Sequence, residues 1–404
     1  MIGSKLSGIT AAVAAVQLAA ACSSSGGTSS PQKSGSTSDG TTPTATATGD
    51  ANLAAALAAA KANVEAHTKF PTTIPSTYTA LPSAPPKKDA NGKPYLVVFL
   101  QCEQNQCASQ GNGIEAAAKA IGWQFKRLNF QQANPATLVT ALKAALQFNA
   151  AGDHLVGAFF SGPSQQAYQS VLSDYAKAGA FVSAAYADKA PSGPGTLPSF
   201  GYADDQLRLG TVLADAQISH ANGAPSKSIL VTVSQYPVFA ATVQGYKDEL
   251  AKVCPKCTTV VADATLQQLG SNGLNQVVVS TAQRNKDAKY IVSVNGSFVA
   301  QLPQSLQSAG LGGKFQIISG QGISLDQQNV LNGTALYTTS SPHTYGGWQD
   351  VDIAVRTVMQ LPVPDADHTV SSYLLTTDNI GKPSDSFDVP VGYPEQFKKL
   401  WKVG

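Results

Sequence analysis

The strongest constraint on the fold is a regular alternation of short strand patterns and amphipathic helical patterns. The strand patterns lie at residues 95–100, 124–130, 155–160, 181–186, 228–233, 258–262, 290–294 and 315–318. The helical patterns lie between them, at residues 113–122, 134–149, 164–178, 204–221, 241–253, 273–284 and 298–309. Such alternation is typical of parallel βαβ units. Because the long helix at 204–221 separates two series of units, and 404 residues can fill two cores, we predict two similar α/β lobes.

The charge and hydropathy patterns exclude several classes of protein. The chain has 27 Lys and Arg against 25 Asp and Glu, whereas a nucleic-acid surface needs a clustered basic excess. Aromatic residues make up 7% of the chain, which argues against a wholly disordered protein. No apolar run reaches the roughly 18 residues of a membrane-spanning helix, which excludes a multispan membrane protein.

The amino-terminal residues predict export. A single Lys5 precedes an apolar stretch that ends in Leu18-Ala19-Ala20-Ala21-Cys22, which resembles a bacterial lipobox. We therefore expect a lipoprotein signal peptide at 1–21, lipidation of Cys22 and an extracytoplasmic domain anchored to the outer face of the membrane. The alternative is a secreted protein with a free Cys22. Residues 22–50 are rich in Ser, Thr and Gly and predict a flexible tether, and residues 51–92 predict a helix followed by a Pro-rich linker.

The remaining four cysteines form two close pairs. Cys102 and Cys107 are five positions apart, and Cys254 and Cys257 are three positions apart. In an oxidising compartment these spacings favour two short-loop disulfides. The second pair is also compatible with half of a zinc site or with a redox motif. Zinc would need further ligands near the pair, and the five His are scattered, so we expect no metal and no cofactor.

The order of elements resembles the type I periplasmic binding proteins, the ribose-binding-like solute receptors of ABC importers. Several local strings carry the resemblance. They are Gly113-Ile-Glu-Ala-Ala-Ala-Lys-Ala-Ile-Gly-Trp123, Val243-Gln-Gly-Tyr246, Ile291-Val-Ser-Val-Asn295, Gln316-Ile-Ile-Ser-Gly-Gln-Gly322 and Pro394-Glu-Gln-Phe-Lys-Lys-Leu-Trp401. The resemblance covers about residues 93 to 401. It implies two doubly wound parallel-sheet lobes joined by a three-crossing hinge. Lobe one would take residues 93–203 plus 341–375, and lobe two 204–340 plus 376–404.

In such a fold the ligand lies beyond the carboxyl ends of the strands. The resemblance therefore implies that ligand-binding residues follow the strands in both lobes. These are Gln101, Glu103, Asn105, Tyr186, Tyr236, Phe239, Thr242, Asn295, Gln321 and Ser340. A disulfide between Cys102 and Cys107 would preorganise the first of these loops, which could otherwise be a merely stabilised surface loop. Tyr236 and Phe239 could equally be packing residues.

The predicted binding residues are mostly neutral. Tyr, Thr, Ala and Gln stand where the family's sugar binders carry Arg and Asp, so we expect a neutral ligand that is sugar-like or partly apolar. Motifs for hydrolase or phosphate chemistry are absent, and His343 is expected to be a solvated loop residue. The resemblance implies a monomeric binding protein with an ABC permease as partner. A receptor for a membrane kinase, or an exported hydrolase or redox protein, are the alternatives.

Overall fold

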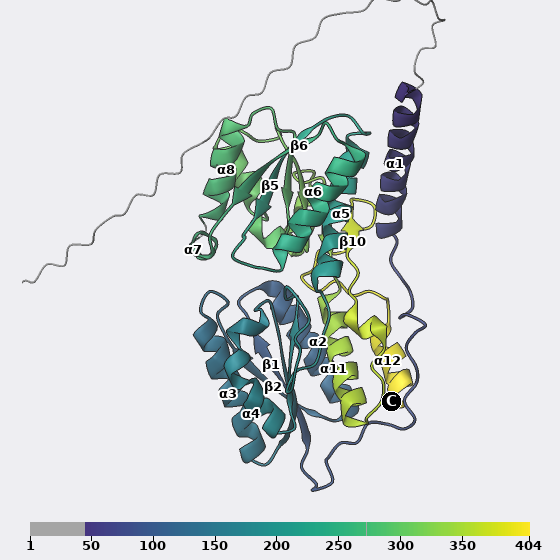
Figure 1. The fold of residues 1–404 in the computed structure, drawn as a ribbon, viewed down its shortest axis with the longest axis vertical. Helices are drawn as coiled ribbons and strands as arrows, with labels where there is room; N and C mark the ends of the chain where they lie inside the picture. The colour runs from purple at the N-terminus through teal and green to yellow at the C-terminus, as the bar shows by residue number, and fades with distance from the viewer. Residues whose placement is uncertain (1–44, 272) are drawn as a thin grey trace, which may run out of the picture. The chain divides into compact units, whose positions relative to one another are not determined.

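The computed structural model describes residues 45–271 and 273–404 (Figure 1). The predicted signal peptide, Cys22 and most of the tether lie outside these residues. Within them, helix α1 (Ala45–His67) covers the range in which a helix is predicted, and no helix has the length and apolar character needed to cross a membrane. The fold class is confirmed, since two α/β lobes, each built on a largely parallel sheet, follow one another along the chain.

Lobe one contains a four-stranded parallel sheet in the order β2-β1-β3-β4. Its strands are β1 (Tyr95–Gln101), β2 (Gln124–Asn129), β3 (His154–Ser161) and β4 (Phe181–Ala185). Its α-helices are α2 (Asn105–Ile121), α3 (Pro135–Ala150), α4 (Leu172–Lys177), α11 (His343–Val358) and α12 (Tyr393–Trp401). Helices α3 and α4 cover one face of the sheet, and α2, α11 and α12 lie on the other (Figure 1). The apolar run of β1 is buried because helices cover both faces.

Lobe two contains a six-stranded sheet in the order β10-β9-β8-β7-β5-β6. Its strands are β5 (Lys227–Thr232), β6 (Thr258–Asp263), β7 (Tyr290–Ser293), β8 (Gln316–Ser319), β9 (Tyr337–Ser340) and β10 (Tyr373–Leu375). Its helices are α5 (Ala203–His220), α6 (Phe239–Val253), α7 (Leu266–Gly270), α8 (Leu274–Arg284), α9 (Leu302–Ser308) and α10 (Ser324–Leu331). All neighbouring strands are parallel except β10, which pairs antiparallel to β9 at the edge.

Each lobe contains one pair of helices that approach closely at glycines. A Cβ atom on Gly113 of α2 would lie 2.0 Å from the Thr344 carbonyl oxygen in α11. A Cβ atom on Gly210 of α5 would lie 2.2 Å from the Thr242 carbonyl oxygen in α6. The backbones can therefore touch only because these positions lack a side chain.

Some predicted element boundaries were wrong. Helix α2 begins eight residues before the predicted start at 113. The predicted helix at 164–178 is two 3-10 turns, Gln165–Ala167 and Gln169–Val171, followed by α4. The buried side chains of Tyr168, Val171, Leu172 and Tyr175 have the spacing of a helix face. The same spacing fits either kind of turn, so the pattern did not distinguish them.

The last part of the chain corrects the predicted lobe boundaries. The chain crosses between lobes after β4, after β9 and after α11, and it crosses again after β10. Residues 373–375 therefore belong to the sheet of lobe two rather than to lobe one. Helix α12 belongs to lobe one rather than to lobe two, because Tyr393, Phe397 and Trp401 are buried in its core. Their spacing of four residues forms one apolar helix face, which needs a partner surface.

The segment before β1 also joins the lobes. In α1, Ala60 packs in the core of lobe two, and the amide of Asn63 donates a 2.6 Å hydrogen bond to Asp215 of α5. Further along, the hydroxyl of Tyr78 donates a 2.6 Å hydrogen bond to Asp367, and the side chain of Leu81 packs in the core of lobe one. Residues 60–94 are therefore an integral part of the folded unit and not a free linker.

Candidate functional site

A pocket of about 550 Å³, which includes space open to solvent, lies between the two lobes. We call it the interlobe pocket. The elements that line it come from the carboxyl ends of the parallel strands in both sheets, where open α/β sheets bind ligands. Its described lining residues are Gln104, Gln106, Cys107, Gln132, Ser161, Gly162, Tyr186, Tyr236, Val238, Phe239, Asn295, Phe298, Gln321 and His343.

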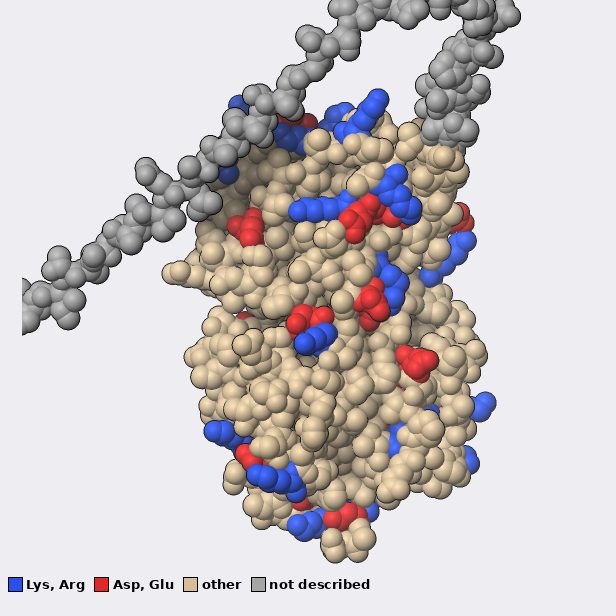
Figure 2. All heavy atoms as spheres, in the orientation of Figure 1, with Lys and Arg blue, Asp and Glu red and all other residues tan. Residues whose placement is uncertain are grey.

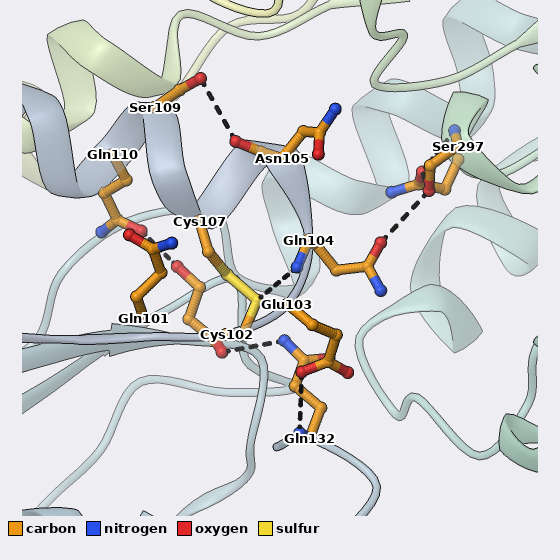
Figure 3. The surroundings of a disulfide bond; sticks show 12 residues. Gln101, Cys102, Glu103, Gln104, Asn105, Cys107, Ser109, Gln110, Gln132 and Ser297 are labelled. Carbon is orange, nitrogen blue, oxygen red and sulfur yellow. Dashed lines mark hydrogen bonds between the residues drawn. A yellow bond between two sulfur atoms is a disulfide. The ribbon is translucent and has the colours of Figure 1, made fainter. Parts of the chain in front are cut away.

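The wall in lobe one is polar and rich in amides. Gln104 and Gln106 follow β1, in the loop and first turn of α2 that the Cys102–Cys107 disulfide closes (Figure 3). Gln132 follows β2, and its amide nitrogen lies 3.3 Å from the carbonyl oxygen of Ser161 at the end of β3. An amide side chain offers both a donor and an acceptor, so this wall can bind a ligand hydroxyl in either sense.

The wall in lobe two is aromatic. Tyr236 and Phe239 lie between β5 and α6, with ring centroids 5.7 Å apart in an edge contact. Phe239 makes a second edge contact with Phe298, which follows β7, at 5.5 Å. Edge-to-face contacts of this kind hold the rings in fixed orientations. The rings therefore form a preformed apolar surface opposite the amides of lobe one.

Two amides from lobe two hold each other in place. The Asn295 amide nitrogen donates to Gln321 Oε1 at 3.3 Å, and Asn295 Oδ1 accepts from the Ser297 backbone at 3.0 Å. Gln321 in turn donates to Gln206 Oε1 of α5 at 3.4 Å. These bonds fix the amide orientations before any ligand arrives. Such preorganisation lowers the entropy that binding costs.

Tyr186 and His343 lie together in the pocket wall, with ring centroids 4.9 Å apart. Both side chains are buried, and neither Tyr186 Oη nor His343 Nε2 has a hydrogen-bond partner among the described residues. Burial raises the pKa of Tyr186 well above its ordinary value of 10.0 and lowers the pKa of His343 to about 4. Both rings are therefore neutral at pH 7.

The backbone at two pocket residues is strained. Tyr186 has a φ of 49° and Gln321 a φ of 48°, in the left-handed region that residues with a Cβ rarely adopt. Each residue follows the last strand position of its βα unit, after β4 and β8 respectively. Strain of this kind concentrates at ligand sites, where the surrounding structure holds the side chain in a particular direction.

A buried series of side-chain hydrogen bonds lies behind the wall of lobe one. The Ser161 hydroxyl donates to the side-chain oxygen of Gln110 in α2, and Gln110 donates to Asp350 of α11 at 2.7 Å. The other carboxylate oxygen of Asp350 accepts from the Ser199 hydroxyl at 2.6 Å. Burial raises the pKa of Asp350 to about 7, although both hydrogen bonds oppose the shift. This series of hydrogen bonds connects the pocket wall to α11 and to the first crossing between the lobes.

Five of the ten residues predicted to bind ligand line the interlobe pocket, namely Tyr186, Tyr236, Phe239, Asn295 and Gln321. The structure brings them together from both lobes, from the ends of four different strands. Their roles as ligand contacts remain predictions.

The other five predicted residues have partners elsewhere. Gln101 accepts a 2.6 Å hydrogen bond from Arg127, and Glu103 accepts one from the Gln132 backbone at 3.2 Å. Asn105 donates to Asp385 at 3.1 Å. Thr242 is buried between α5 and α6, where it donates to Gln206 at 3.0 Å, and Ser340 is buried in β9 opposite Tyr373 of β10.

Several residues that line the interlobe pocket were not predicted from the sequence. His343, expected to be a solvated loop residue, is buried in the first turn of α11, because the crossing after β9 leads directly into this helix. Gln104 and Gln106 were missed for a different reason. Side chains in the loop after β1 alternate in direction, so Gln104 and Gln106 face the pocket while their neighbours Glu103 and Asn105 do not. Gln132 follows the predicted strand at 124–130, so the rule that ligands lie beyond strand ends could have found it. The remaining missed residues are Ser161, Gly162, Val238 and Phe298.

Both predicted disulfides are present, Cys102–Cys107 beside the pocket and Cys254–Cys257 between α6 and β6. Residues 45–271 and 273–404 contain no group of three or more His, Cys, Asp or Glu side chains arranged to hold a metal ion. On the face drawn in Figure 2, basic and acidic side chains are sparse and interspersed. No continuous basic surface is seen on that face of the described residues.

No protein-family profile matches the sequence, and no curated protein matches it either. Solved structures do match. An ABC transporter solute-binding protein from Burkholderia graminis in complex with D-arabinose has a TM-score of 0.60 and 17% identity, over 74% of this chain and 99% of that one. One from Actinobacillus succinogenes with bound D-allose has a TM-score of 0.61 and 14% identity, over 71% and 99%. The Caulobacter myo-inositol binding protein bound to myo-inositol has a TM-score of 0.57 and 17% identity, over 70% and 94%.

Proposed function

Because the chain has the fold of the type I periplasmic binding proteins, we propose that it captures a small neutral solute between its lobes and delivers it to the permease of an ABC transporter. The observation that carries the proposal is the interlobe pocket, built from both lobes and lined by neutral side chains.

The absence of charge in the pocket favours a neutral ligand. None of the described lining residues is Asp, Glu, Lys or Arg, and His343 is neutral because burial lowers its pKa to about 4. A charged ligand would lose its hydration on entering this pocket without gaining an opposite charge. A neutral ligand loses less hydration energy, and hydrogen bonds to the pocket amides can offset that loss.

The distribution of polar and apolar groups favours a ring that carries hydroxyl groups. The rings of Tyr236, Phe239 and Phe298 can cover the apolar face of such a ligand, while the amides opposite bind its hydroxyls. Tyr186 Oη and His343 Nε2 are buried without a partner, and a ligand hydroxyl could bind both. Sugars and cyclitols combine these features. The similar structures with bound D-arabinose, D-allose and myo-inositol agree with this ligand class.

The amino-terminal sequence supports extracytoplasmic anchoring. The lipobox-like string that ends at Cys22 would place a lipid at the start of the mature chain, ahead of the predicted tether. The protein would then stay near the permease while its lobes bind ligand outside the membrane. Substitution Cys22→Ser should release the protein from the membrane fraction, and retention of the variant there would contradict the anchor.

A thermal-shift screen followed by calorimetry tests the ligand class. A ligand that binds only the folded chain raises the melting temperature by mass action. D-allose, D-arabinose and myo-inositol represent neutral ligands, and D-glucuronate and D-glucosamine are charged counterparts of similar size. We expect stabilisation by at least one neutral compound and by neither charged one. Stabilisation by the charged compounds alone would overturn the proposal.

A matched pair of variants locates the binding site. Phe239→Leu removes a ring of the pocket wall, whereas Phe125→Leu removes a half-buried ring on β2 outside the pocket. We expect the first substitution to weaken binding of the neutral ligand and the second to leave it unchanged. Equal effects of both would place the ligand elsewhere.

A further inference from the structure

The loop closed by the Cys102–Cys107 disulfide carries three successive side chains that reach toward lobe two. The Ser297 hydroxyl, after β7, lies 3.4 Å from Gln104 Oε1, and Figure 3 shows Gln104 extended toward it. Gln106 Nε2 donates a 2.9 Å hydrogen bond to the carbonyl oxygen of Gln321 after β8. Asn105 lies between these two residues in the sequence and makes the third contact.

The third contact runs through Asp385, in the segment that returns from β10 to α12. Asn105 Nδ2 donates to one carboxylate oxygen of Asp385 at 3.1 Å. The other oxygen accepts from the backbone N–H of Ser324, the first residue of α10 in lobe two, at 2.7 Å. The carboxylate therefore bridges the loop of lobe one to a helix of lobe two.

The disulfide fixes the base of this loop in lobe one. Cys102 and Cys107 are only 2% and 4% exposed and belong to the core of lobe one. Inside the loop the Cys107 N–H donates to the Gln104 carbonyl oxygen at 3.1 Å. The cross-link and this bond restrict the directions that residues 104–106 can take, so the three side chains are held toward lobe two.

We infer that residues 102–107 form a latch that holds the lobes together over the ligand, and that the disulfide is the element that positions it. This inference rests on the proposed function. Contacts between lobes that exist only when the lobes approach favour the closed arrangement and slow the release of ligand. Asn105, predicted to bind ligand, acts between the lobes instead. Loss of one hydrogen bond of ordinary net strength should accelerate release about fivefold.

Two pairs of serine substitutions provide a matched test in the full chain. Cys102→Ser with Cys107→Ser removes the disulfide of the latch. Cys254→Ser with Cys257→Ser removes the disulfide before β6, at the amino end of the strands and therefore at the opposite edge of the sheet from the pocket. Small-angle scattering gives the radius of gyration without sugar and with saturating D-allose, D-arabinose or myo-inositol.

We expect the first pair to increase the radius of gyration relative to the unmodified chain, and the second pair to leave it unchanged. An unchanged radius for the first pair in every condition would overturn the inference, even if its melting temperature falls, because a merely structural disulfide would affect stability alone. If none of the sugars binds, the proposed ligand class fails, and the comparison without sugar still decides whether the latch exists.

Single substitutions separate the side chains from the cross-link. Asn105→Leu keeps about the size of the side chain and removes its donor to Asp385. Asn105 does not line the interlobe pocket, so this variant removes a contact between the lobes without removing a ligand contact. Asn112→Ala is the control, because Asn112 accepts its hydrogen bond from Arg127 within lobe one. We expect about fivefold faster release of the bound sugar for the first variant and no change for the second. Equal release rates would contradict a latch role for Asn105.

Discussion

Substitution of Asp350 by Asn should change how stability depends on pH. Asp350 is fully buried, and both of its hydrogen-bond donors, Gln110 and Ser199, are neutral. Asparagine has nearly the same shape. Its carbonyl oxygen can accept from Gln110, and its NH₂ group can donate to the Ser199 hydroxyl, which is both donor and acceptor. The variant should therefore fold with the same buried hydrogen bonds and without a buried charge.

The sign follows from the raised pKa. Burial raises the pKa of Asp350 from 3.8 to about 7, so the folded chain holds a proton that the unfolded chain has lost between these values. The contribution of Asp350 to stability is therefore present below pH 3.8 and is lost as pH rises toward 7. A shift of this size corresponds to about 4 kcal/mol. For a chain of this length that equals roughly 5 °C in melting temperature, given an unfolding entropy of about 2 cal/mol/K per residue.

Melting temperatures of both chains between pH 4.5 and 8.5 test this reasoning. Asp350→Asn should gain stability relative to the unmodified chain as pH rises, with the difference levelling off above about pH 7. His343 contributes in the opposite direction, because burial lowers its pKa from 6.5 to about 4 and stability is lost as pH falls between them. Its contribution is common to both chains and cancels in the difference. Asp204→Asn, at an exposed position of α5, controls for the lost charge. A difference that does not vary with pH would refute the reasoning.

Three further substitutions have defined expectations. Tyr186→Phe should leave the melting temperature nearly unchanged, because the Tyr186 hydroxyl has no hydrogen-bond partner among the described residues. The same variant should weaken sugar binding in calorimetry, and an unchanged affinity would contradict a role for this hydroxyl in the pocket. Gly113→Ala should lower the free energy of unfolding, measured with denaturant, by about 1–3 kcal/mol or more, since the new Cβ would lie 2.0 Å from the Thr344 carbonyl oxygen. An unchanged free energy of unfolding would mean that α2 and α11 can separate freely. Trp401→Ala should cost about 3–5 kcal/mol, because the ring is fully buried and stacks on Trp348 at 5.3 Å; a small loss would show that α12 contributes little to lobe one.

The sequence predicted the parts of the fold that depend on short-range pattern. Apolar runs such as residues 95–100 predicted the strands, and the close cysteine pairs indicated both disulfides. The pattern failed where tertiary contacts decide the outcome. Helix α12 has a clear apolar face, but the sequence does not say which lobe covers it. Its ring contacts with Trp348 of α11 place it in lobe one.

The candidate site shows the same division. The rule that ligands lie beyond strand ends predicted Asn295, Gln321 and the aromatic residues after β5, since strand ends can be found from the sequence alone. It did not resolve neighbours within one loop. Gln104 and Gln106 face the pocket, whereas Asn105 between them turns to Asp385. That choice depends on the helical start of α2 and on a carboxylate 280 positions away.

The sequence by itself therefore determined a two-lobed α/β chain with two disulfides, and it predicts an export signal and a nearly uncharged binding face. Only the tertiary structure decided which side chains meet in the pocket, that the chain returns to lobe one at its end, and that His343 is buried beside Tyr186. The physical reason is the range of the interactions. Propensity and periodicity act over a few residues, whereas burial, pKa shifts and contacts between lobes arise from groups brought together by the whole fold.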